Sequence, residues 1–213
     1  MTIDPTSAPR PLAETVSLLF VSLVFLFSGF AALIYQVVWQ RTLFAIYGVN
    51  IESVTIVVTT FMVGLGLGSL AGGRLSLDPG RSLLRTFGAL ELSIGGFGLF
   101  SLKLFHWVGL FTAGRSVWTT LSISFALLLL PTLMMGATLP LLVTDAVRRL
   151  HNVGRSVSIL YFVNTLGSAF AALATSIYLL GRLGQQATVT LAAALNLIVG
   201  SSVLLASRRD RRS

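Results

Sequence analysis

The chain alternates long apolar stretches with short polar ones. Apolar stretches lie at 16–40, 51–74, 84–105, 118–143, 156–180 and 187–206. A helix of about 20 apolar residues crosses roughly 30 Å of hydrocarbon, so each stretch is long enough to span a membrane. Runs such as SFALLLLPTLMM lack the alternation of apolar and polar residues that marks the strands of a membrane barrel. The pattern therefore predicts an all-α integral membrane protein, a bundle of six transmembrane helices.

Composition agrees with the membrane assignment. Hydrophobic residues make up 54% of the chain and charged residues 10%, with a mean hydropathy of +0.88, whereas a soluble domain carries about 25% charged residues. The first apolar stretch continues into YQVVWQRTLF without a small-residue cleavage site, so we interpret it as a retained helix. The chain has no cysteine, which excludes disulfides and thiolate metal sites. We expect no metal and no cofactor in this chain.

The formal net charge is +8, and the basic residues that produce it lie mainly in the expected loops and ends of the chain. Most of the basic residues fall in the N-terminal arm, the second and fourth loops and the C-terminal end. By the positive-inside rule, both termini should be cytoplasmic in a multi-pass protein of the cell inner membrane. This distribution accounts for the charge without a nucleic-acid partner. We expect a cytoplasmic arm at 1–15, a six-helix transmembrane domain at 16–206 and a basic cytoplasmic tail at 207–213.

The second apolar stretch contains the glycine-dense segment GLGLGSLAGGR. A phosphate-binding loop would have to follow a strand and open a helix, and these glycines lie within a span. Gly64, Gly68 and Gly72 recur every four residues and therefore share one helix face. We expect this face to pack closely against a neighbouring helix.

Glu91 is the acidic residue that lies well inside a predicted span. Its neighbours at helical spacing are Gly88, Gly95 and Gly98, which make that face narrow and suited to close packing. A charge at membrane depth is costly, so we expect Glu91 to point into the bundle, either protonated or paired. It is either a carboxyl in an interhelical hydrogen bond or part of a ligand or proton site.

Several polar residues are predicted to share the depth of Glu91 in the inner leaflet. Gly136 and Thr138 lie near the end of one span, and Tyr161 and Asn164 near the start of the next. We hypothesise that these five residues form a small polar pocket for a ligand, with a simple packed kink as the alternative.

The same segment, LPTLMMGATLPLL, contains two prolines inside an apolar span. Pro131 and Pro140 each lack an N–H, which frees the carbonyl four residues earlier, at Gly136 in the second case. At membrane depth a freed carbonyl needs a partner from protein or cavity water. We expect Thr138 and Asn164 to serve as partners.

A second polar cluster is expected at the outer face, formed by Gln36 and Arg41 at the end of the first span and Glu52 at the start of the next. Tyr35 and Trp39 lie beside it and are typical of aromatic anchors at the membrane interface. The plainer interpretation is an interface anchor with a local Arg41–Glu52 pair, which would add little stability.

Several ordered segments resemble one protein family: SGFAALIYQVVWQRTLFAIYG, FMVGLGLGSLAGGRL, ALELSIGG, LPTLMMGATLPLL and GRSVSILYFVNTLGSAFAAL. Together they are similar to the membrane-integral domain of bacterial membrane-bound spermidine synthase-like proteins, which fuse a transporter-like part to a spermidine synthase. The segment GSLAGGRLSLDPGR is also similar to the loop between helices 2 and 3 of major-facilitator transporters.

The resemblance implies a soluble, Rossmann-like aminopropyltransferase domain that uses decarboxylated S-adenosylmethionine and a polyamine. This sequence has no βαβ unit and no paired carboxylates that would bind a polyamine and accept its proton. We therefore expect no catalytic residues here, and no aminopropyl transfer by this chain alone.

Three functions stay open. The chain either anchors or serves a polyamine aminopropyltransferase at the cytoplasmic face, or is a transporter-like half that moves a small amine or other solute. It is otherwise a structural subunit of a larger membrane complex. The expected partners are the lipid bilayer, a soluble transferase domain or subunit, and a second copy of the chain.

Overall fold

The computed structural model describes residues 11–47 and 50–209, and every element within them is helical. The helices are α1 Pro11–Tyr47, α2 Asn50–Ser76, α3 Leu83–Thr112, α4 Val117–Leu150, α5 Val153–Ala174, the π-helix η2 Thr175–Leu179 and α6 Leu180–Arg209. The all-helical prediction is therefore confirmed over the described residues.

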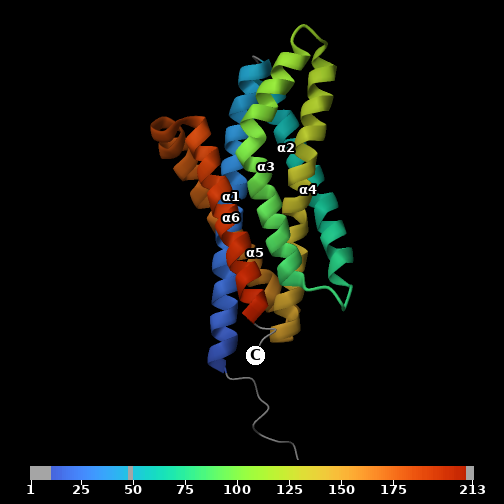
Figure 1. Cartoon of the computed structure of the whole chain (residues 1–213), viewed down its shortest axis with the longest axis vertical. Coiled ribbons are helices and arrows are strands. Elements are labelled where there is room, and N and C mark those ends of the chain that lie inside the picture. Colours follow the sequence, from blue (N-terminus) through green and yellow to red (C-terminus); the bar gives the residue numbers. More distant parts are fainter. Residues whose placement is uncertain (1–10, 48–49, 210–213) are drawn as a thin grey trace, which may run out of the picture.

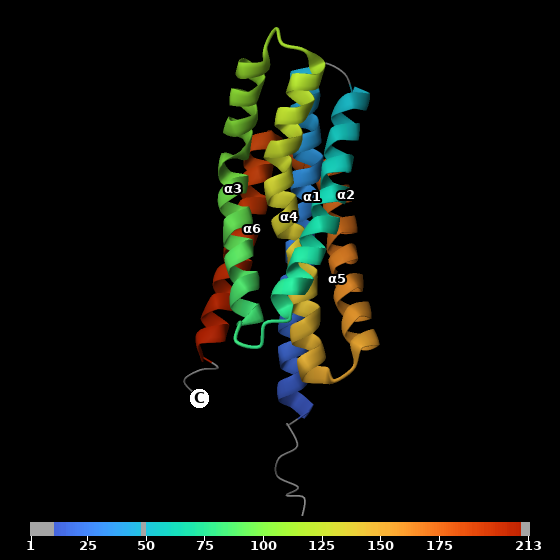
Figure 2. The same cartoon turned by 90° about the vertical axis from the view of Figure 1, so that its right-hand side faces the viewer.

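The helices form an elongated bundle with α1 at its centre. Each of the other helices contacts α1, while α2 packs mainly on α4 and α3 mainly on α6. The α2–α3 loop, the α4–α5 loop and the end of α6 lie at one end of the bundle (Figures 1 and 2). The α3–α4 loop lies at the opposite end. Because arginines lie in the α2–α3 loop and in the helix turns on either side of the α4–α5 loop, we call this end of the bundle the basic end.

The observed helices are longer than the apolar stretches that predicted them. For example, α4 continues seven residues past the expected end at 143, through Arg148 and Arg149 in its last turn. Basic side chains are favourable there because they interact with the negative end of the helix dipole. At the other terminus, α1 begins at Pro11, so residues 11–15 of the predicted arm are already helical. The rest of that arm, 1–10, and the end of the predicted tail, 210–213, lie outside the described residues.

Five segments of the described chain are long and apolar enough to cross a membrane: Leu18–Ile46, Val54–Ser76, Leu83–Thr112, Trp118–Leu150 and Val153–Arg208. The last has 56 residues, which would extend roughly 84 Å as one straight helix. Instead, Gly184 has non-helical dihedrals (φ 74°, ψ 176°), and α5 and α6 run in opposite directions on either side of the turn (Figure 1). The structure thus supports a multi-pass membrane protein with five such segments, one of which folds back on itself.

The outer surface of the bundle carries many large apolar side chains. Met62 on α2 is 71% exposed, and Leu70, Phe100, Phe162 and Ile198 are also exposed. In water such extended apolar exposure is unfavourable, whereas in lipid it is the expected surface. The helix surfaces are therefore suited to contact with acyl chains.

Close packing of α2 on α4 depends on small residues. A Cβ added to Gly68 would collide with the backbone carbonyl of Leu133, and one added to Gly136 would lie 2.5 Å from the carbonyl oxygen of Leu65. Gly64 and Gly72 meet Thr132 and Ala137 in the same way. The expected packing role of the Gly64, Gly68 and Gly72 face is confirmed.

Candidate functional site

Glu91 lies at the centre of a buried polar contact among three helices. Its side chain is 0% exposed, so the expected inward orientation is confirmed. The hydroxyl of Ser28 on α1 donates to Oε1 at 2.5 Å, and Nδ2 of Asn196 on α6 donates to Oε2 at 2.5 Å. The carboxyl group therefore joins α1, α3 and α6 through interhelical hydrogen bonds.

A small cavity, the inner cavity, borders this contact. It has a volume of about 130 Å³ and is lined by Ser28, Gly29, Ala32, Leu33, Gln36, Phe61, Leu65, Ile94, Met135, Thr138, Asn164, Ser168 and Asn196. Both hydrogen-bond partners of Glu91 line it, while Glu91 itself lies behind them. The buried Oδ1 of Asn196 has no hydrogen-bond partner among the described residues, which leaves an acceptor beside the cavity.

A second cavity, the side cavity, adjoins the first. It has a volume of about 220 Å³ and shares Leu65, Met135, Thr138 and Asn164 with the inner cavity. Gly136, Thr138, Tyr161 and Asn164 all line it, so the structure brings four of the five predicted pocket residues together. Tyr161 is 63% exposed and lies on the outer side of this group. Glu91 is separated from the other four by its hydrogen-bond partners.

The helix α4 continues unbroken through both of its prolines. The hydroxyl of Thr138 donates to the carbonyl of Met135 at 2.6 Å, so the expectation that it satisfies the carbonyl of Gly136 is wrong. Threonine hydroxyls in helices commonly bond to a carbonyl in the preceding turn in this way. The residues just before Pro140 thus line the two cavities: Met135 and Thr138 line both, and Gly136 and Leu139 line the side cavity.

The predicted outer-face cluster is not assembled as expected. Gln36 lines the inner cavity, whereas Arg41 lines a different opening. Five residues of helix rotate a side chain by about 140°, which places the two residues on different faces of α1. Glu52 lies in the first turn of α2, and its side chain lies outside the described residues.

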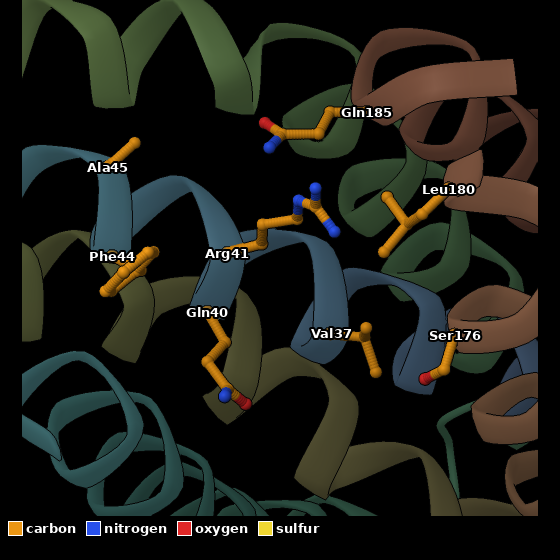
Figure 3. Close-up of a pocket in the computed structure, with 8 residues that line it drawn as sticks. All are labelled: Val37, Gln40, Arg41, Phe44, Ala45, Ser176, Leu180 and Gln185. Atoms are coloured by element: carbon orange, nitrogen blue, oxygen red, sulfur yellow. The ribbon is translucent and has the colours of Figure 1, made fainter. Parts of the chain in front are cut away.

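Arg41 lines an open cleft at the end of the bundle opposite to the basic end. This outer cleft has a volume of about 660 Å³ and is lined by Val37, Gln40, Arg41, Phe44, Ala45, Ser176, Leu180 and Gln185. Figure 3 shows the guanidinium of Arg41 and the amide of Gln185 extending into the space between α1 and the turn that leads into α6. The hydroxyl of Thr42 lies 2.9 Å from the carbonyl oxygen of Val38 and 3.2 Å from Oε1 of Gln185, so its one proton is shared between a bond within α1 and a contact with this turn.

Tyr35 and Trp39 are core residues, and their expected role as interface anchors is wrong. Both are fully buried, and their rings stack with centroids 4.9 Å apart. Nε1 of Trp39 donates to the hydroxyl of Ser101 at 3.1 Å, while the hydroxyl of Tyr35 lies against Gly98 without a hydrogen-bond partner among the described residues. Helix α1 continues to Tyr47 beyond these rings, so they lie deeper than the sequence pattern indicated.

The described carboxylates lie apart from one another. Asp78 pairs with Arg81 and Asp145 with Arg149 at the basic end, whereas Glu91 lies about two turns into α3 and bonds to Ser28 and Asn196. Within the described residues, no group of three His, Cys, Asp or Glu is arranged to bind a metal ion. The chemistry that this arrangement offers is the binding of a cation or a proton beside the inner cavity.

The fold and the cavities together indicate the class of protein: over the described residues it is an all-helical, multi-pass membrane protein with an apolar core and a small buried polar cluster. No protein-family model matches the chain, and no solved structure matches it. Among curated proteins, the chain is 31% identical over 175 residues to polyamine aminopropyltransferase 2 of Streptomyces coelicolor. The match covers 76% of this chain and 30% of that protein, so the chain spans less than a third of its relative.

The similarity falls on the apolar helices, because helices occupy nearly all of the described chain and three quarters of the chain is matched. It supports a link between this chain and polyamine aminopropyltransferases, in agreement with the resemblance to spermidine synthase-like proteins.

Proposed function

We propose that this chain is the multi-pass membrane module of a spermidine synthase-like protein. In this role it anchors or serves a polyamine aminopropyltransferase at the cytoplasmic face of the cell inner membrane. The observation that carries the proposal is the 31% identity to a polyamine aminopropyltransferase, which falls on helices apolar enough to cross a membrane. Transfer itself belongs to another domain or subunit, because the described part of this chain offers no paired carboxylates.

The proposed topology has six crossings in a transporter-like half, with both termini cytoplasmic. The reversal at Gly184 supports counting α5 and α6 as separate crossings. Arg81, Arg148 and Arg155 belong to loops or helix ends at the basic end, and the positive-inside rule assigns such an end to the cytoplasm. A transferase docked there would meet an exposed, positively charged surface.

The test is purification of the tagged chain in mild detergent from the cells that produce it. The eluate is then assayed for aminopropyl transfer from decarboxylated S-adenosylmethionine to putrescine. We expect transferase activity to co-elute with the chain. Arg155→Glu should reduce this activity because it reverses an exposed charge at the basic end, whereas Arg115→Glu at the opposite end should not. An eluate without transferase activity, or one dominated by an unrelated complex, contradicts the proposal.

A second candidate function is favoured by the buried carboxyl of Glu91 beside the inner cavity. In this case the chain is a transporter-like half that binds and moves a small amine. Buried acidic side chains in membrane proteins commonly mark ion or substrate pathways. Ser28 and Asn196, which border the cavity, would position the carboxyl toward an ammonium group.

This candidate is tested by equilibrium binding of labelled spermidine to the purified chain. Binding should be lost in Glu91→Gln and retained in Asp145→Asn, which removes a carboxylate already paired with Arg149 at the basic end. Equal binding by both variants, or none by the unmodified chain, rules out Glu91 as the amine site.

A further inference from the structure

A third cavity, the basic cavity, lies at the basic end of the bundle, among the α2–α3 loop, the last turns of α4 and the end of α6. Its volume is about 340 Å³. Its lining includes Arg81, Ser82, Arg85, Asp145, Arg148 and Arg149. Four guanidinium groups thus share one opening with a single carboxylate from the same lining.

The arginines of this cavity are incompletely neutralised by the described residues. Asp145 pairs with Arg149 at 2.8 Å, and Arg81 has a longer contact of 3.6 Å with Asp78. Arg148 donates to the backbone carbonyl of Ser76 at 3.1 Å, which supplies no charge. Like charges held together repel one another, so this cluster favours an anion between them.

Arg85 is the most informative member of the cluster. Its Nε is buried, and no hydrogen-bond partner for it lies among the described residues. Burying a guanidinium nitrogen without a partner costs free energy, because the nitrogen loses its hydrogen bond to water and forms none with the protein. A ligand that accepts from Nε would restore that hydrogen bond.

The start of α3 adds donors to the same opening. Ser82, Leu83 and Leu84 line the cavity, and Ser82 at the N-cap makes no side-chain capping hydrogen bond. The first amide groups of a helix have no partner within the helix, and the positive end of the helix dipole attracts anions. The arginine cluster and this helix start therefore face a common space.

We infer that the basic cavity binds the phosphate group of an anionic ligand. Guanidinium groups bind phosphate oxygens in a bidentate manner, and helix starts donate backbone N–H groups to them. The cavity lies at the end of the membrane helices, where lipid headgroups are found and where basic pockets between helices bind them. A phospholipid headgroup and a soluble phosphate share this chemistry. The site is independent of the proposed link to polyamine transfer.

The experiment measures thermal unfolding of the whole chain in mild detergent with added phosphatidylglycerol, phosphatidylcholine or inorganic phosphate. We expect phosphatidylglycerol to raise the midpoint and phosphatidylcholine to have a smaller effect. A comparable rise with millimolar inorganic phosphate would identify a soluble phosphate as sufficient. The rise should shrink at high salt, because the attraction is between partly exposed charges. If neither phosphatidylglycerol nor phosphate shifts the midpoint, the site does not exist.

Arg85→Gln is the decisive variant. It should weaken binding about tenfold or more, since a hydrogen bond to a charged group contributes about 1.5–3 kcal/mol. Its stability without ligand should be unchanged or higher, because Nε of Arg85 contacts no acceptor in the described protein. Arg85→Lys keeps the charge and should restore part of the binding. The matched control is Arg115→Gln, an exposed arginine in the α3–α4 loop, which should bind as the unmodified chain does. Equal binding by Arg85→Gln and Arg115→Gln overturns the inference.

Discussion

Glu91 is the residue on which the interior chemistry depends, because it accepts hydrogen bonds from two other helices. Replacing it with leucine leaves Ser28 and Asn196 without their acceptor. Interhelical hydrogen bonds in membranes contribute about 1 kcal/mol each, so Glu91→Leu should lower the free energy of unfolding by roughly 2 kcal/mol. Glu91→Gln keeps one acceptor oxygen and should cost less. Unfolding in mixed micelles with increasing sodium dodecyl sulfate measures both differences.

Ser93→Ala is the control for this comparison. Ser93 is on the same helix, and its exposed hydroxyl donates only to the carbonyl of Ala89 within the helix. Its removal should change stability by less than about 0.5 kcal/mol. Equal stability of Glu91→Leu and Ser93→Ala would mean that the buried contact contributes nothing.

The sequence identified Glu91 but not its partners. A charged residue inside an apolar span, flanked by glycines at helical spacing, must face the interior, and this follows from local pattern alone. Ser28 and Asn196 are 63 and 105 residues away along the chain. Pairing at such separations depends on how the helices pack, which spacing within one helix does not determine. The sequence signal that could have identified Asn196 as a buried polar residue is its position as the one amide in the apolar run AAALNLIVG.

At the scale of the helix, contact between α2 and α4 depends on which glycines face the partner. Gly68 lies against the backbone of Leu133, whereas Gly66, two residues away, has no atom within 4 Å of an added Cβ. Gly68→Ala should therefore force the helices apart and lower the thermal midpoint in detergent. Gly66→Ala should leave it unchanged or raise it, because alanine favours helix by about 1 kcal/mol over glycine. Similar midpoints for the two variants would disprove the close approach.

The turn into α6 depends on the backbone of Gly184. Its dihedrals, φ 74° and ψ 176°, belong to a region that residues with a Cβ almost never adopt. Gly184→Ala should cost about 1–3 kcal/mol of stability and displace the part of α6 that follows Gly184. The matched control is Gly181→Ala, where an added Cβ meets no atom within 4 Å. Thermal unfolding of both variants measures this difference. If Gly184→Ala unfolds at the same temperature as the unmodified chain, the turn is not held in this conformation.

The sequence predicts where the helices lie more accurately than where they end or which of their side chains point inward. Each apolar stretch lies within a helical segment, because about 20 apolar residues in lipid must satisfy their backbone internally. The ends extend further because helical hydrogen bonding continues past the apolar core, as at Arg148 and Arg149. The prediction of which way a side chain points was wrong for Tyr35 and Trp39. Aromatic residues next to polar ones resemble interface anchors in sequence, but both of these rings are buried, and Trp39 bonds to Ser101 of α3.

At the scale of the whole molecule, the distribution of charge is the strongest argument for how the chain sits in a membrane. Arginines gather at the basic end, in the α2–α3 loop and in the helix ends beside the α2–α3 and α4–α5 loops, while Arg115 lies in the α3–α4 loop at the other end. The same concentration of charge that supports the proposed orientation by the positive-inside rule also forms the basic cavity. The proposed orientation and the proposed phosphate site therefore rest on one surface.

The proposed topology predicts which loops are accessible from each side of the membrane. The chain has no native cysteine, so single cysteines can be introduced without background. Gly80→Cys and Val153→Cys should react with a membrane-impermeant maleimide only from the cytoplasmic side. Ala113→Cys and Leu183→Cys should react only from the opposite side. All four positions are exposed in the structure, so lack of labelling from one side reports the membrane and not burial.

Leu183→Cys decides the number of crossings, because Leu183 precedes Gly184, where the chain reverses near the start of α6. If α5 and α6 each cross, the turn must emerge on the side opposite to Val153. The 56-residue segment that contains them is nearly three times the roughly 20 residues needed for one crossing, and its reversal leaves the turn a full helix length from Val153. Labelling of Leu183→Cys and Val153→Cys from the same side would instead make this segment a hairpin that enters and leaves by one face, and would reduce the six crossings to four.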